Sequence, residues 1–246
     1  MKMSRMVAAG AAAVLLAASP VHAQGIPSAR VAVTVSAGYG ITSRTFSQTT
    51  TFELFSEDGS LTSTYTVKRT PLFEAAATAR LWRHLGAGIA FSSMRQTRGA
   101  QITAQIPDPF EFDQFHPITG APSVLHDERA VHAQAAFWFA ATRRLDVVVS
   151  GGPSFFTAKG DFVTDVTYAD PFPYNAPVYQ TATLTRSRKT TIGANVGVEA
   201  GWRLASHVGL AAVARYSRAT ADFTSAGGPS VVLGGLHAGG GIRLLF

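Results

Sequence analysis

Apolar and polar side chains alternate at every second position through residues 231–246, the last stretch of the chain. One set of alternate positions carries no polar side chain, whereas the other set contains His237 and Arg243. Successive side chains of a β-strand point to opposite faces, so this stretch predicts a strand with one apolar face and one face that accepts charge. The strand ends on Phe246 without a turn or tail, which is typical of a strand that closes a barrel and leaves no exposed edge.

Seven further stretches alternate in the same way, five of them regularly and two less so. The eight strands are therefore predicted at residues 30–41, 73–82, 85–92, 131–142, 145–156, 192–202, 208–216 and 231–246. Most are close to the ~9–11 residues that a tilted strand needs to cross a bilayer. Pro153 lacks an N–H group for the ladder, so a β-bulge is expected there.

The connections between these strands alternate in length. The short ones are residues 82–85, 142–146 and 202–207, and the long ones are 42–70, 96–129, 158–189 and 217–230. Bacterial outer-membrane barrels have short turns in the periplasm and long loops outside the cell. The predicted fold is all-β, an eight-stranded antiparallel up-and-down transmembrane β-barrel with short periplasmic turns and long extracellular loops.

The long connections are expected to be hairpins that continue above the membrane. Asp58-Gly59 predicts a hairpin turn between strand-like residues 45–55 and 61–67. The next two long connections each carry an Asp-Pro-Phe-x-aromatic tip. The candidate interaction residues of these tips are Phe110, Phe112, Phe172 and Tyr174. Proline could hold these aromatics exposed for recognition, or they could pack on each other and cap the barrel mouth.

Composition supports a membrane barrel. Apolar residues make up 46% and charged residues 15% of the chain, and mean hydropathy is +0.15. No apolar run of ~20 residues follows the N-terminal segment, so no spanning helix is expected. The absence of cysteine argues against a disulfide scaffold and zinc–thiolate sites. Without a dense Lys/Arg cluster, the net charge of +6 does not indicate nucleic-acid binding. The protein is expected to bind no metal or cofactor and to be a monomer.

Residues 1–23 have the organisation of a secretory signal peptide. Lys2 and Arg5 precede a short apolar run, and Val21-His22-Ala23 forms a small-residue cleavage site. Export followed by assembly in the cell outer membrane is therefore predicted, with residues 24–246 as the barrel domain.

The inward-facing positions contain a set of polar side chains. They are Glu74, Arg80, His132, Gln134, Asn195, Glu199, Arg215, His237 and Arg243. An eight-stranded barrel has room only for its own side chains, and an unpaired charge inside would cost several kcal/mol. Glu74 and Glu199 are expected to pair with the arginines in a closed polar interior. A solute path would instead need a continuous water column.

Three outward positions suggest contacts with lipid. Arg95 and Lys159 are predicted near the outer headgroups, where they could meet lipopolysaccharide phosphates. Trp202 suits the inner aromatic girdle. Trp82 and Trp138 fall on the inward parity and do not fit a girdle.

The signal peptide, the eight strands, the short turns and the final alternation through Ile242, Leu244 and Phe246 resemble the outer membrane protein beta-barrel domain family, which includes small barrels of the outer-membrane-protein A and X types. The resemblance implies recognition of the C-terminal strand by the barrel assembly machinery. Its members differ in role, so fold alone does not assign function.

The expected function is structural or surface-interacting, in adhesion or envelope integrity, with an unidentified extracellular partner. Three alternatives stay open: a soluble lipocalin-like ligand-binding barrel, a small pore, and a lipid-modifying barrel enzyme. Family barrels that act on lipid A use a His with a Ser and an acid near the membrane rim. Here the histidines fall in loops or the interior, so no enzyme is expected.

Overall fold

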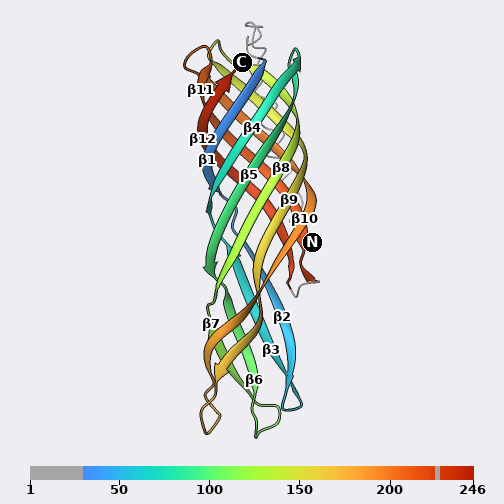
Figure 1. Ribbon diagram of the computed structural model, residues 1–246, viewed down its shortest axis with the longest axis vertical. Helices are drawn as coiled ribbons and strands as arrows, with labels where there is room; N and C mark the ends of the chain where they lie inside the picture. The colour runs from blue at the N-terminus through green and yellow to red at the C-terminus, as the bar shows by residue number, and fades with distance from the viewer. Residues whose placement is uncertain (1–29, 225–227) are drawn as a thin grey trace, which may run out of the picture.

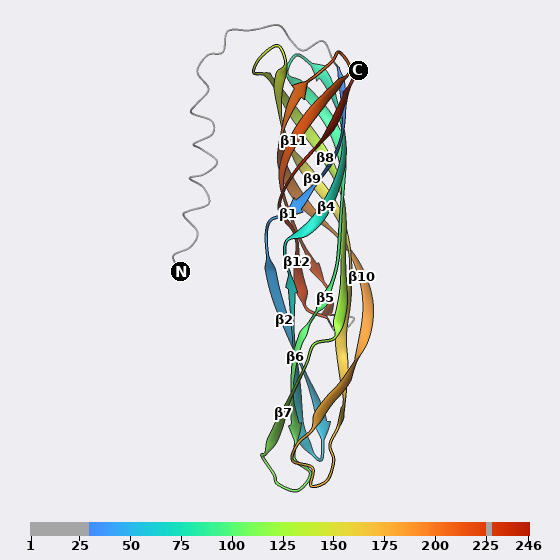
Figure 2. The ribbon, with the colours of Figure 1, turned by 90° about the vertical axis from the view of Figure 1, so that its left-hand side faces the viewer.

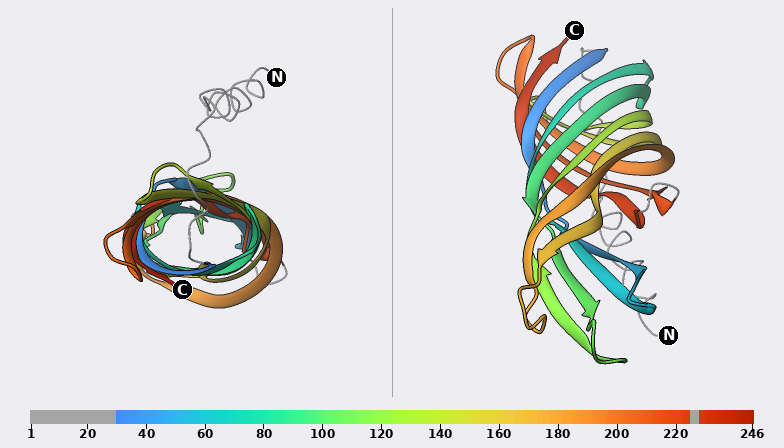
Figure 3. Two further views of the ribbon diagram at one scale, coloured as in Figure 1. Left: turned by 90° about the horizontal axis from the view of Figure 1, so that it is seen from above. Right: turned by 60° about the horizontal axis from the view of Figure 1, so that its bottom comes forward.

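Eight strands form a closed antiparallel barrel in the computed structural model, which describes residues 30–224 and 228–246. The predicted signal peptide lies outside the described residues. The barrel strands, in their order around the ring, are β1 (Val31–Gly40), β12 (Ser230–Leu245), β11 (Val208–Asp222), β10 (Val178–Arg203), β9 (Leu145–Ala169), β8 (Ser123–Ala140), β5 (Leu85–Gly99) and β4 (Thr70–Trp82). The ring is seen end-on in Figure 3. The predicted fold class and all eight predicted strands are confirmed.

Pairing of β12 with β1 closes the barrel, as the alternation of the last stretch predicts. The register runs from Ala32 opposite Leu245 to Gly40 opposite His237. The backbone of Phe246 extends this pairing, because its N–H donates to Val31 O at 2.9 Å. Every barrel strand is therefore hydrogen-bonded to a neighbouring strand on both sides.

The apolar face of each barrel strand points outward. Ile89, Ile192 and Ile242 are 56%, 68% and 58% exposed. The charged side chains Glu74, Arg215 and Arg243, on the opposite face of their strands, are buried inside. A lipocalin-type barrel requires the opposite arrangement. Within the described ranges, no helix is long and apolar enough to cross a bilayer.

Two local predictions about the barrel strands need correction. The register is the same before and after Gly152-Pro153 on both sides of β9, so Pro153 causes no bulge, although the pairing with β8 is interrupted at these two residues. A register shift occurs instead between Arg80 and Trp82, where β4 pairs with β5. This irregularity turns Trp82 outward, to 66% exposure, whereas Trp138 follows its inward parity and is 1% exposed.

Beyond one end of the barrel lies a second sheet, formed by β2 (Arg44–Leu54), β3 (Glu57–Val67), β6 (Gln101–Pro107) and β7 (Phe115–Gly120) in the order β2-β3-β6-β7. The long hairpin of β9 and β10 extends beside this sheet, as Figures 1 and 2 show. We call residues 44–67, 101–120 and 160–187 the head. The first three long connections are thus mostly strand, and they join into one body.

The turn between β2 and β3 differs from the prediction. Leu54 pairs with Glu57, so the two loop residues are Phe55 and Ser56, with φ of 55° and 65°. Asp58-Gly59 lies inside β3. The glycine has another reason to be there, because a Cβ at Gly59 would collide with the ring of Phe52.

An apolar core holds the head together and continues into the barrel mouth. Its members include Leu61, Tyr65 and Ile102 from the sheet and Phe162 from β9, together with Phe156, which faces the barrel interior. The buried N–H of Val163 donates to the Tyr65 hydroxyl at 2.8 Å. The ring of Tyr65 stacks on Phe46 at 5.1 Å and meets Phe162 edge-on at 5.7 Å. The barrel therefore opens onto packed apolar side chains.

Candidate functional site

The outer half of the barrel interior is organised around one carboxylate, Glu74 of β4. Arg215 of β11 donates to both of its oxygens, Nε to Oε2 at 3.1 Å and Nη2 to Oε1 at 2.9 Å. Nε2 of His237, from β12, lies 2.7 Å from Oε2. All three side chains are buried. The charge of Glu74 is thus met by hydrogen-bonded partners from two other strands.

The same network extends to the opposite wall. Arg215 Nη1 donates to Asn195 Oδ1 at 2.9 Å, and Asn195 Nδ2 donates to the Ser154 hydroxyl at 2.9 Å. The ring nitrogens of His132 lie 3.0 Å from the Ser92 hydroxyl and 2.8 Å from the Ser154 hydroxyl. His132 therefore sits between two serines, in the fully buried middle of the bore.

Gln134 lies beside this chain of contacts, where its side-chain amide oxygen accepts from Arg215 Nη2 at 3.0 Å. The polar side chains of β4, β5, β8, β9, β10, β11 and β12 together cross the bore. Side-chain hydrogen bonds therefore fill this level of the barrel.

A second cluster occupies the periplasmic half. Arg243 of β12 pairs with Asp146 of β9, and its Nε lies 3.2 Å from Glu199 Oε1. The Thr34 hydroxyl donates to the same oxygen of Glu199 at 2.9 Å. Arg243 is 1% exposed. A cation inside the barrel is again matched by carboxylates.

Trp138 lines this second cluster. Its ring centroid is 5.1 Å from Arg243 Cζ and 5.9 Å from Arg80 Cζ, within range of cation–π attraction. Gly201 makes room for the arginine, because a Cβ there would collide with the guanidinium. This glycine is needed for packing and not for backbone conformation.

The structure brings together the side chains that the alternation assigned to the interior, and it adds others. Glu74 meets Arg215 and Glu199 meets Arg243, while Arg80 lies over Trp138. Asp146, Ser92 and Ser154 were missed. A signal for Asp146 existed, because it shares the inward parity of Ser150 and Ser154 along β9.

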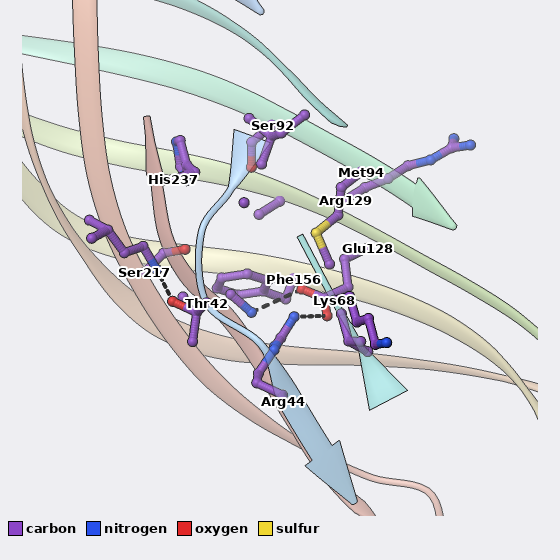
Figure 4. A pocket seen from close by; sticks show the side chains of 17 residues that line it. Thr42, Arg44, Lys68, Ser92, Met94, Glu128, Arg129, Phe156, Ser217 and His237 are labelled. Carbon is purple, nitrogen blue, oxygen red and sulfur yellow. Dashed lines mark hydrogen bonds and ion pairs between the residues drawn. The ribbon is translucent and has the colours of Figure 1, made fainter. Parts of the chain in front are cut away.

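Above the polar interior, an ion-pair cluster crosses the barrel mouth (Figure 4). Arg44 Nη2, at the start of β2, lies 2.8 Å from Glu128 Oε1 of β8, and His126 Nε2 lies 2.6 Å from the same oxygen. Glu128 Oε2 accepts the N–H of Gly234 at 2.9 Å. Beneath it lies a cavity of about 30 Å³, lined by Ser92 and His237. At roughly 10–15 Å³ per water, about two water molecules fit there.

The far end of the head carries the predicted aromatic tips. Phe110, Phe112 and Phe172 are 74%, 75% and 83% exposed. The ring of Tyr174 lies 5.9 Å from both Phe110 and Phe172. The two tips therefore touch each other, but at the distal end of the head and not over the barrel mouth.

Asp108 organises one of these tips. Its Oδ1 accepts the N–H groups of Phe110 and Glu111 at 2.7 and 2.9 Å, and its Oδ2 lies 2.8 Å from His116 Nε2. The contact with His116, followed by the bond from Phe110, lowers the pKa of the Asp108 carboxyl. Local hydrogen bonds thus fix the turn that presents Phe110.

The predicted assembly residues lie on the outer wall of β12. Ile242, Leu244 and Phe246 are 58%, 41% and 65% exposed, all on one face. Recognition of these three residues by the barrel assembly machinery stays a prediction. In the part of the chain that the structure describes, no group of three or more His, Asp or Glu side chains could hold a metal ion.

No protein-family model matches the chain, and no curated protein matches it. Among solved structures, the chain is similar to the outer membrane protein OprG from Pseudomonas aeruginosa, with 8% identity, 90% of this chain and 98% of that chain covered, and a TM-score of 0.49. Neisserial surface protein A is 14% identical, with coverage of 88% and 97% and a TM-score of 0.45. The attachment invasion locus protein Ail of Yersinia pestis is 12% identical, with coverage of 87% and 99% and a TM-score of 0.38.

The architecture itself defines the class of protein. A bilayer admits only strands whose backbone groups are all paired and whose outer side chains are apolar, and a closed barrel meets both conditions. This chain has eight such strands, short turns at one end, a head at the other, and a cluster of buried charged side chains in its interior. The chain therefore has the fold of a small outer-membrane β-barrel protein.

Proposed function

We propose that this barrel is a non-enzymatic surface protein whose head binds a partner outside the cell through its aromatic tip. The observation that carries the proposal is the exposure of Phe110, Phe112 and Phe172 at the distal end of a head with its own apolar core. Aromatic side chains dominate the binding energy of interfaces when they are presented on a rigid support.

The support beneath the tip favours recognition over a passive loop. The head core and the buried bond between Val163 N–H and the Tyr65 hydroxyl hold the sheet together. The Asp108 turn fixes the backbone at Phe110. Because these residues are ordered before binding, little conformational entropy remains to be lost on contact.

Binding of the detergent-solubilised protein to an array of immobilised purified proteins and polysaccharides tests the proposal. The wild type should bind at least one array member saturably. A variant with Phe110→Ser, Phe112→Ser, Phe172→Ser and Tyr174→Ser should lose that binding. The matched control is Leu184→Ser, which removes a half-exposed apolar side chain (37%) from the flank of the head.

Two results would contradict this role for the tip. One is binding that survives the four substitutions in a variant with wild-type heat-modifiable mobility. The other is the absence of saturable binding to the whole array.

A further inference from the structure

A row of basic side chains lies on the outer wall just beyond the apolar belt. Arg95 of β5 pairs with Asp127 of β8, Asp127 pairs with Lys159 of β9, and Lys159 pairs with Arg188 of β10. We call Arg95, Lys159 and Arg188 the cation ladder. With neighbouring strands about 4.8 Å apart, its ends are separated by about 14 Å.

The nearby carboxylates are already engaged by other arginines. Asp127 accepts from Arg129 Nε at 3.2 Å, and Asp161 accepts from Arg186 at 2.7 and 3.0 Å. Among the described residues, no carboxylate forms an ion pair with any member of the cation ladder. The patch of five cations and these two carboxylates therefore keeps an excess of three positive charges.

Lys159 and Arg188 lie directly opposite each other on neighbouring strands. Like charges in this position destabilise a sheet. The neighbouring carboxylate, Asp127, lies opposite Lys159 on the other side but forms its ion pair with Arg129, so it offsets the repulsion only in part. An anion bound from outside would therefore stabilise the Lys159–Arg188 pair further. An arginine beside a lysine suits a phosphate group, since guanidinium can donate two parallel hydrogen bonds to its oxygens.

The position of the cation ladder relative to the membrane indicates what kind of molecule carries the phosphate. Four residues before Arg95 and Lys159 on the same outward face are Phe91 and Phe155, which are 39% and 47% exposed in the apolar belt. Four residues after Arg188 comes Ile192, again outward and 68% exposed. The cations thus lie where the belt ends, at the level of the outer headgroups.

An apolar groove adjoins one end of the cation ladder. It has a volume of about 530 Å³ on the outer face of β1, β4 and β5, and its lining includes Tyr39, Pro71 and Phe73, with Arg95 also present. A phosphate held by Arg95 would place an attached acyl chain beside this groove. The combination fits an amphiphile better than a free phosphate ion.

We propose that the cation ladder is a binding site for the phosphate group of an anionic lipid in the outer leaflet, with an acyl chain of that lipid in the groove beside Arg95. The site belongs to the barrel wall, so this inference does not depend on the role of the aromatic tip.

Native mass spectrometry of the whole protein in detergent tests the site with three probes. Dioleoylphosphatidic acid carries phosphate and acyl chains, dioleoylglycerol carries the same chains without phosphate, and glycerol 3-phosphate carries the phosphate without chains. The ladder variant combines Arg95→Gln, Lys159→Gln and Arg188→Gln. Each cation near an anionic headgroup contributes about fivefold, so phosphatidic acid should bind about 100-fold more weakly to this variant.

The control variant combines Arg143→Gln, Arg144→Gln and Arg203→Gln, which removes the same charge from the periplasmic end. It should bind phosphatidic acid like the wild type, and dioleoylglycerol binding should not differ among the three proteins. Equal binding of phosphatidic acid to the ladder variant and the wild type would overturn the site. Glycerol 3-phosphate that binds as tightly as phosphatidic acid would show a site for soluble phosphates and overturn the lipid assignment.

Discussion

Substitution of Glu74 tests whether the barrel interior around this carboxylate is filled by side chains and closed to bulk water. In the wild type the carboxylate accepts two bonds from Arg215 and lies 2.7 Å from His237 Nε2. Glu74→Ala would leave the guanidinium of Arg215 buried without its charge partner. Removal of one partner from a buried ion pair costs about 3–5 kcal/mol.

The free energy of unfolding gives the readout. With a urea dependence of about 2 kcal/mol/M, a loss of about 4 kcal/mol lowers the unfolding midpoint by about 2 M. The assay is urea unfolding of the protein refolded into lipid vesicles, followed by tryptophan fluorescence and gel mobility. The control, Glu53→Gln on the exposed face of β2, should leave the midpoint unchanged.

A double-mutant cycle separates the lost pair from general damage. When Arg215→Met accompanies Glu74→Ala, the unpaired charge disappears, so the double variant should be more stable than the Glu74→Ala protein. A loss of less than about 1 kcal/mol in Glu74→Ala, the value of a solvated surface pair, would contradict a closed interior. Such a result would mean that water reaches Arg215.

Three further outcomes follow from single contacts. Tyr65→Phe leaves the Val163 N–H buried without its acceptor and should destabilise the protein by about 1–3 kcal/mol, measured by the same urea assay. Gly201→Ala places a methyl group where the Arg243 guanidinium lies, and the overpacking should cost about 1–3 kcal/mol and lower the thermal midpoint of the gel shift. The folded pKa of Asp108 is depressed, so its stabilising effect is present above the unfolded pKa and is lost as pH falls through the folded value. The protection factor of the Phe110 amide, which removes the intrinsic pH dependence of exchange, should therefore fall as the pH drops below the ordinary pKa of aspartate, about 4, whereas in Asp108→Asn it should show no such step.

The barrel could be predicted from the sequence because a membrane imposes a strict alternation on each strand. Each side chain faces either lipid or a narrow interior, so parity alone separates Ile242 from Arg243. The alternation also places Glu74 and Arg215 inside, although they are 141 residues apart. Their pairing follows from the small bore, which gives them few other neighbours.

The head could not be predicted to the same extent. Its sheet joins β3 to β6, which belong to different long connections, and no local pattern specifies that register. The Asp58-Gly59 signal misplaced the turn because Gly59 is small for another reason, the ring of Phe52 above it. Trp82 points outward because of one register shift between β4 and β5. Counting alternate positions in the sequence cannot detect such a shift.

The accessibility of single spin labels in vesicles tests most directly whether an apolar wall surrounds a closed interior. Labels on cysteines that replace Ile89, Val198 and Ile242, all exposed on the outer wall, should collide with lipid-soluble oxygen and be shielded from a water-soluble nickel chelate. A label at Ser36, buried on the opposite face of β1, should be shielded from both reagents. Collision of the outer labels with the nickel chelate, or free access of the chelate to position 36, would contradict an apolar wall around a closed interior.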